Sequence, residues 1–88
     1  MEISYKIVIS KSAEKEISKL PIKEILKIKD AILGLADNSR PFGVKKLEGF
    51  NDLYRIKKGN YRIIYDIEDD ILTVEVLKIG NRKDVYKN

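Results

Sequence analysis

The stretch from Leu53 to Ile67 reads LYRIKKGNYRIIYDI, and it decides the fold of this chain. Apolar and polar residues alternate on both sides of Gly59-Asn60, a dipeptide that favours a tight hairpin turn. The pattern predicts two antiparallel strands, Leu53–Lys58 and Tyr61–Ile67. Because successive side chains of a strand point to opposite faces, each strand has one face for a core and one face that carries charge.

Three more strands are predicted around this hairpin. Residues 2–9 alternate between apolar and polar side chains, which predicts an N-terminal strand. Lys45–Leu47 is predicted to form a short strand ended by Gly49, and Ile71–Ile79 a long one. The acidic run Glu68-Asp69-Asp70 is predicted to be a solvated turn before the long strand.

Two helices are predicted in the stretch that follows the first strand and ends at about residue 42. In this stretch the apolar residues recur with a period of 3.6. Ser10 or Ser12 is placed to cap the first helix, and Pro21 suits the first position of the second. We expect the second helix to end near Asp37–Asn38, because the residue before Pro41 is disfavoured in a helix. The two apolar stripes comprise Ala13, Ile17 and Leu20, then Ile22, Ile25, Ile28 or Lys29, Ile32 and Leu35.

This order of elements predicts an α+β fold in one domain over residues 1–88. An N-terminal strand and a helical hairpin precede an antiparallel β-meander, so a single twisted sheet carries the helices on one face. The tail from Gly80 to Asn88 is too short for another packed helix. We expect it to leave the sheet as a loop that lays Val85 and Tyr86 back on the surface.

Composition excludes several classes of protein. The chain has no cysteine, which excludes a disulfide scaffold and fits a reducing cytoplasm. No apolar run approaches the roughly 20 residues of a membrane span, and the N-terminus lacks the layout of a signal peptide. We therefore expect a cytoplasmic protein without a membrane partner. The net charge of +4 and the pI of about 9.3 favour, without proving, binding to polyanions.

Cations from three predicted elements are able to meet on one sheet face. Arg55 and Lys57 share a face of their strand and lie about 7 Å apart, given a rise of about 3.4 Å per residue. A tight hairpin brings Arg62 beside Arg55 or Lys57, and Arg82 emerges just past the last strand. Two interpretations stay open: an anion-binding site, or scattered surface cations that aid solubility and block pairing at sheet edges.

The residues that are missing also limit the chemistry. The chain has no histidine, no carboxylate pair spaced to hold magnesium and no glycine-rich phosphate loop. If the protein cleaves RNA, it must therefore use lysine, arginine or tyrosine side chains, without a cofactor.

Two segments resemble the signatures of RelE-type toxins of the RelE/ParE superfamily, whose members belong to type II toxin–antitoxin systems. The central one begins with Leu47-Glu48-Gly49 and continues over Leu53–Tyr65, and the closing one is Ile79–Tyr86. With the helical hairpin before them, the resemblance covers essentially the whole chain. It implies a microRNase-like fold and metal-free cleavage of mRNA in the ribosomal A site, in which the 2′-hydroxyl attacks the adjacent phosphate.

The resemblance also implies a role for each matching residue. Lys57 is the candidate base, and Arg55, which stands where lysine is common, acts electrostatically. Arg62 matches the arginine that stabilises charge on the phosphate, and Arg82 the arginine assigned to the leaving group. Tyr86 matches the aromatic residue that stacks on a base, although the short tail anchors it less firmly.

Other lysines are candidates for RNA binding, and one position departs from the family pattern. Asn81 stands where the family often has histidine or another basic residue. The candidate RNA-binding residues are Lys45, Lys46, Lys58, Lys78 and Lys83.

The resemblance implies a RelB-like antitoxin as partner in a hetero-oligomer, with the ribosome and mRNA as targets. Two alternatives remain. One is a ParE-like toxin that inhibits DNA gyrase without cleaving RNA, and the other is an inactive basic domain that helps an antitoxin bind DNA. The ribonuclease is favoured if the full set of candidate catalytic residues lies on one surface, because a gyrase inhibitor does not need such a set. The set consists of Arg55, Lys57, Arg62, Arg82 and Tyr86.

Overall fold

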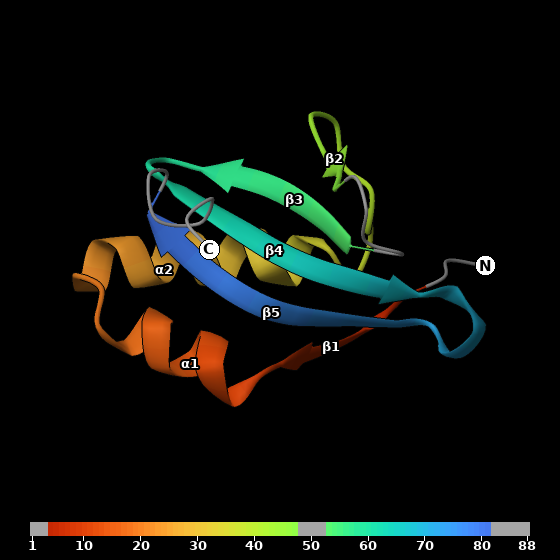
Figure 1. The fold of residues 1–88 in the computed structure, drawn as a ribbon, viewed down its shortest axis with the longest axis horizontal. Coiled ribbons are helices and arrows are strands. Elements are labelled where there is room, and N and C mark those ends of the chain that lie inside the picture. The colour runs from red at the N-terminus through yellow and green to blue at the C-terminus, as the bar shows by residue number, and fades with distance from the viewer. Residues whose placement is uncertain (1–3, 48–52, 82–88) are drawn as a thin grey trace.

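The computed structural model describes residues 4–47 and 53–81, in which two helices accompany a five-stranded sheet (Figure 1). The predicted order of strand, two helices and meander is confirmed. No helix in this described part is long and apolar enough to cross a membrane. The elements are β1 (Lys6–Ile9), α1 (Lys11–Ser18), α2 (Ile22–Gly34), β2 (Lys45–Lys46), β3 (Leu53–Lys58), β4 (Tyr61–Glu68), the 3₁₀ turn η1 (Asp69–Ile71) and β5 (Thr73–Asn81).

The sheet has the strand order β1-β5-β4-β3-β2. The strands from β2 to β5 pair antiparallel, as the meander predicts, whereas β1 pairs parallel with β5 and makes the sheet mixed. The predicted N-terminal strand over residues 2–9 is shorter in the structure, since β1 starts at Lys6. Residues 2 and 3 of that prediction lie outside the described residues.

The helix boundaries follow from local hydrogen bonds. Ser10, rather than Ser12, caps α1, and its Oγ accepts a 3.0 Å hydrogen bond from the backbone N–H of Ala13. Pro21 precedes the first helical residue of α2 instead of occupying that position. The predicted end of α2 near Asp37–Asn38 is wrong, because α2 ends at Gly34 and tighter turns of the i to i+3 type continue from there.

The central hairpin matches its prediction closely, and the long strand does not. β3 has the predicted bounds, and Gly59 takes the left-handed conformation (φ +60°) that its turn requires. The predicted strand Ile71–Ile79 is displaced toward the C-terminus, because η1 and the left-handed Leu72 (φ 47°) complete the turn before Thr73. β5 then runs through Gly80 and Asn81, so the tail does not leave the sheet at Gly80.

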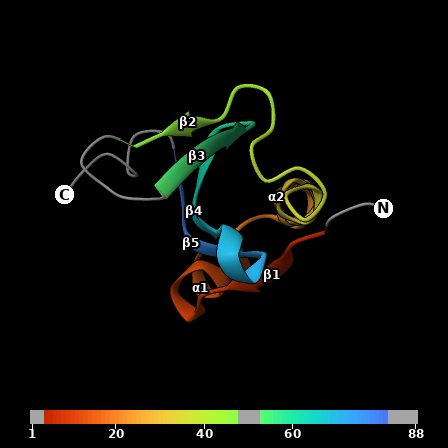
Figure 2. The same cartoon turned by 90° about the vertical axis from the view of Figure 1, so that its right-hand side faces the viewer.

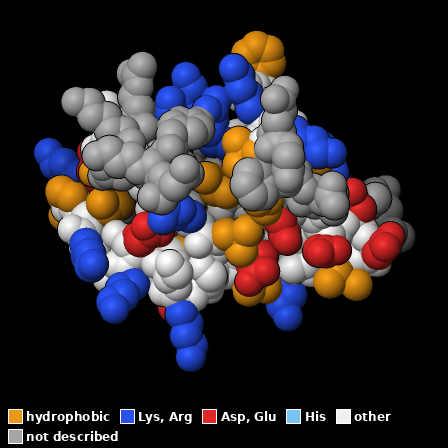
Figure 3. Space-filling view, viewed as in Figure 1, with side chains coloured by type: hydrophobic (Ala, Val, Ile, Leu, Met, Phe, Trp, Pro, Cys, Tyr) orange, Lys and Arg blue, Asp and Glu red, His pale blue; other side chains and the backbone are white. Residues whose placement is uncertain are grey.

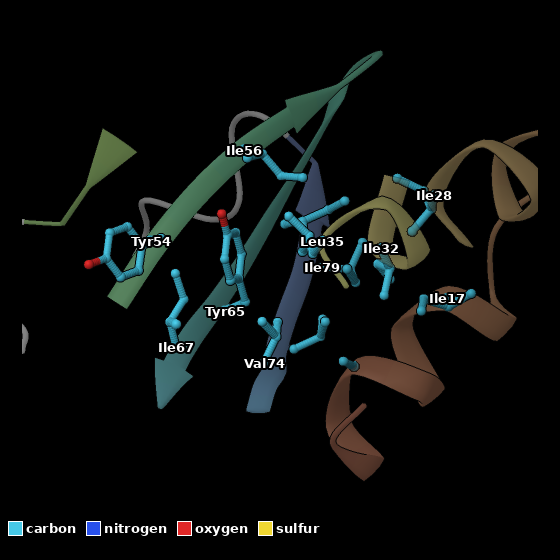
Figure 4. Packing of buried hydrophobic residues seen from close by; sticks show 13 residues of the cluster. Ile17, Ile28, Ile32, Leu35, Tyr54, Ile56, Tyr65, Ile67, Val74 and Ile79 are labelled. Carbon is cyan, nitrogen blue, oxygen red and sulfur yellow. The ribbon is translucent and has the colours of Figure 1, made fainter. Parts of the chain in front are cut away.

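Both helices contribute to a hydrophobic core on one face of the sheet (Figure 2). In the hairpin, the buried residues are the ones that alternation assigns to the core, including Tyr54, Ile56 and Tyr65 (Figure 4). On α2, Ile28 is buried and Lys29 is exposed, so the helical stripe passes through Ile28. The core residues leave the opposite face of β3, β4 and β5 for charged side chains.

Candidate functional site

The hairpin brings two of the predicted cations directly opposite each other on the outer face of the sheet. Lys57 on β3 is the register partner of Arg62 on β4, whose other neighbour is Gly80 on β5. This confirms that Arg62 lies beside Arg55 or Lys57, and identifies Lys57 as that residue. Lys57 is exposed, whereas Arg62 is only 7% exposed, so its neighbours hold its side chain in place.

A second row of residues crosses the same face one step along the strands. In this row, Lys45 on β2 pairs with Arg55 on β3. Arg55 also pairs with Ile64 on β4, and Ile64 in turn pairs with Lys78 on β5. The next row contains Asp66 instead of a cation. The outer face is therefore basic toward the hairpin turn and acidic toward η1. Figure 3 shows Lys and Arg side chains along the edge formed by β2 and β3, and a group of Asp and Glu side chains toward η1.

A bulge in β5 decides which way Lys78 points. The register shifts between Ile64 and Tyr65, so that Ile64 pairs with Lys78 while Tyr65 pairs with Val76. Leu77 is therefore an extra residue in β5. Strict alternation would place Lys78 on the core side with Val76, but the bulge turns Ile79 into the core and Lys78 outward.

Side chains of α1 and of its N-cap residue form hydrogen bonds with the backbone of β5 beyond the end of β1. Ser10 Oγ donates a 3.1 Å hydrogen bond to the carbonyl oxygen of Leu77, and Glu16 Oε1 accepts one of 2.8 Å from the N–H of Ile79. Glu16 Oε2 also lies 3.8 Å from Lys78 Nζ. The sequence interpretation missed Glu16, although its position beside the apolar stripe of α1 was a signal. Lys78, a candidate for RNA binding, is thus partly engaged by this carboxylate.

Residues 7–86 match the model of a family described as the ParE toxin of the type II toxin–antitoxin system parDE. The chain belongs to this toxin family. It is 30% identical to RelE1 of Methanocaldococcus jannaschii over 98% of this chain and 99% of that protein. The resemblance to the RelE/ParE superfamily is confirmed.

Solved structures give this toxin the same fold as RelE. The RelE–RelB complex of Pyrococcus horikoshii superposes with a TM-score of 0.81 at 30% identity, covering 92% of this chain and 98% of that one. The isolated RelE toxin of Escherichia coli superposes with a TM-score of 0.78 at 29% identity, covering 94% and 92%. The α+β fold predicted from the sequence is confirmed.

The toxin does not place all candidate residues on one surface. Arg55, Lys57, Arg62, Lys45 and Lys78 share the outer face of the sheet. Lys46 and Lys58 pair with Tyr54 and Tyr61, so they belong to rows of the core-side face. The predicted site residues outside the described part of the chain are Arg82, Lys83 and Tyr86.

A polar cluster at the far end of the sheet was not predicted, because Asp69 was interpreted as a solvated turn residue. The Asp69 carboxylate instead accepts hydrogen bonds from Arg40, with Nη2–Oδ2 at 2.9 Å, and from the Tyr5 hydroxyl. Arg40 also lies over the Tyr54 ring, with its Cζ 5.3 Å from the ring centroid. Its Nη2 donates a 3.4 Å hydrogen bond to the Tyr54 hydroxyl. The hydrogen bonds from Arg40 and then Tyr5 hold the pKa of Asp69 below its usual value. The cluster ties the segment after α2 to β3 and η1.

The described part of the toxin contains no group of three or more His, Cys, Asp or Glu residues placed to hold a metal ion.

Proposed function

We propose that this toxin is a ribosome-dependent endoribonuclease that cleaves mRNA in the ribosomal A site without a metal ion. The observation that carries the proposal is the direct pairing of Lys57 with Arg62, with Arg55 in the adjoining row of the same face. Arginine binds phosphate through two parallel hydrogen bonds, so Arg55 and Arg62 in adjoining rows are placed to hold one phosphodiester with Lys57 directly beside it.

The chemistry suited to these side chains is internal transfer at phosphorus. The 2′-oxygen of the nucleotide forms a bond to phosphorus while the bond to the 5′-oxygen of the next nucleotide breaks. We assign Lys57 as the base that takes the proton of the 2′-hydroxyl, and Arg82 as the residue that donates a proton to the departing 5′-oxygen. Arg62 and Arg55 stabilise the charge that grows on the phosphate oxygens. Tyr86 completes the site by stacking on a base.

The matching family model bears the name ParE, which favours a gyrase inhibitor as the alternative function. Both branches share the fold, so the fold does not separate them. The paired cations at Lys57 and Arg62 favour the ribonuclease, because protein recognition does not require two cations side by side on a sheet face.

Cleavage should depend on the ribosome. The cation rows bind RNA but do not align the 2′-hydroxyl with the leaving oxygen, and such alignment contributes up to about 7–11 kcal/mol in favourable cases. We therefore expect A-site mRNA on programmed ribosomes to be cleaved more than about 10³-fold faster than the same RNA free in solution. Single-turnover rates on both substrates measure this, and a supercoiling assay with gyrase is the matched control. Equal rates on the two RNAs would refute ribosome dependence, and gyrase inhibition without cleavage would establish the alternative.

A RelB-like antitoxin is the partner that we propose for this toxin. The solved RelE structure from Pyrococcus horikoshii is a RelE–RelB complex. In this chain, Ile22, Leu26 and Leu33 are 69%, 63% and 64% exposed and share one face of α2 that is turned away from the core. Exposed apolar side chains in such a stripe indicate a protein contact.

Hydrogen exchange should show that the antitoxin wraps the toxin. A segment that folds on binding covers a large area, so we expect slower exchange across α2 and along one edge of the sheet in the complex than in the free toxin. Comparing both states by mass spectrometry measures this. Slower exchange confined to one small patch would contradict the wrapping mode.

A further inference from the structure

Phe42 is the most exposed large hydrophobic residue among those that the structure describes, at 107% of its reference area. It lies at the corner of a tight turn in which the N–H of Val44 donates a 3.0 Å hydrogen bond to the carbonyl oxygen of Pro41. Gly43 has a φ of +89°, as the third residue of a type II turn requires. An aromatic side chain in this position adds nothing to the core.

The turn is held firmly at its base. Just before it, the carbonyl oxygen of Ser39 accepts a 2.8 Å hydrogen bond from the buried Tyr65 hydroxyl, and Arg40 forms its ion pair with Asp69. Phe42 therefore lies on a segment that is already held in place. Less conformational entropy of this segment is lost when a ligand binds.

A groove of about 370 Å³ lies beside Phe42, between the C-terminal half of α2 and β3. This volume is within the range of small-molecule sites. Its walls are mainly apolar, with an amide and an ammonium group among them. The lining includes Leu35, Asn38, Pro41, Phe42, Ile56 and Lys57.

Lys57 links this groove to the candidate catalytic face, because it lines the groove and is also the register partner of Arg62. Lys45, exposed on β2, comes directly after the turn. None of the described residues that line the groove carries a carboxylate. An exposed aromatic ring among cations suits unpaired RNA, in which bases stack on aromatic faces while lysines contact phosphates.

We propose that Phe42 and this groove bind an unpaired base of the mRNA, adjacent to the phosphodiester held at Lys57 and Arg62. The base stacks on the Phe42 ring, and the Asn38 side chain, whose Oδ1 accepts a 3.3 Å hydrogen bond from the Arg40 N–H, offers its amide N–H donors to the base edge. The proposal rests on the ribonuclease function proposed above. It adds a binding site for the substrate on the side of Lys57 away from β5.

The test measures toxin binding to ribosomes programmed with an mRNA that carries a 2′-deoxy nucleotide at the cleavage position, so that it stays intact. An abasic nucleotide is placed in turn at each position flanking that nucleotide. We expect Phe42→Ala to weaken binding by about 5- to 100-fold, the range for losing one stacked base, and Phe42→Trp to retain it. One abasic position should weaken the parent toxin by a similar factor and leave Phe42→Ala unaffected. Ile71→Ala, which removes a side chain that is 68% exposed, is the matched control and should bind like the parent.

Three outcomes would overturn the proposal. A loss with Phe42→Ala that couples to no abasic position would assign the ring to ribosomal RNA or protein. Unchanged binding to ribosomes with weaker binding to the antitoxin would assign the groove to the antitoxin. Equal losses of ribosome binding in Phe42→Ala and Ile71→Ala would show that removing any exposed apolar side chain weakens binding.

A parallel measurement of cleavage with Lys57→Ala separates this proposal from the proposed function. Lost cleavage in Lys57→Ala together with no effect of Phe42→Ala would overturn only the base-binding site. Full cleavage in Lys57→Ala would overturn the ribonuclease site itself, and with it the reason to place a phosphodiester beside the groove.

Discussion

Replacing Lys57 with alanine is expected to lower the single-turnover rate of A-site mRNA cleavage by about 10²–10⁴-fold, the range for losing a general base. Lys57 is exposed on the outer face, so its loss leaves the core intact. Because proton transfer belongs to the transition state, binding to the ribosome should change little. Cleavage at saturating toxin, with ribosome affinity measured separately, tests both parts.

Lys11→Ala is the control, since Lys11 is an exposed lysine at the start of α1 and lies outside the cation rows. It removes the same charge and should cleave at the parental rate. A result in which Lys57→Ala cleaves within a few-fold of the parent while Lys11→Ala is crippled would show that the active face is misplaced.

Replacing Ile32 with alanine is expected to lower the free energy of unfolding by about 2–5 kcal/mol. Ile32 is 1% exposed, and α2 buries it against the sheet. A domain of this size has about 4–13 kcal/mol in total, so the change removes a large share of its stability. Denaturant unfolding of the isolated chain measures the loss, and the Lys57→Ala background, which we expect to be inactive, allows the toxin to be produced without its partner.

Leu33→Ala provides the comparison, because Leu33 is the next residue on α2 and is 64% exposed. It should change the free energy of unfolding by no more than about 0.5 kcal/mol. Similar losses in the two variants would mean that α2 does not face the core through Ile32.

Sequence patterns alone determined the central hairpin and the division of its two faces. The period of two over Leu53–Ile67 and the turn at Gly59-Asn60 are local signals, since each depends on residues close in the chain. They correctly predicted that Tyr54 and Ile56 are buried and that Lys57 lies outside. They also brought Arg62 to the correct side of the hairpin, because the length of the turn determines the register.

The same local patterns were less accurate at the ends of elements. The last turn of α2 and the start of β5 depend on tight turns at Gly34 and Leu72 that the hydrophobic period does not report. The bulge at Leu77 interrupts the period of two, so alternation alone would place Lys78 on the wrong face.

Tertiary structure alone decided the contacts between segments far apart in the chain. Glu16 reaches the backbone of Ile79 across 63 residues, and Tyr5 reaches Asp69 across 64. Likewise, β1 joins the sheet beside β5, and Arg40 anchors the turn that presents Phe42. A periodic pattern reports which face of an element is apolar, and the partner that completes a hydrogen bond or an ion pair is determined only when the elements pack together.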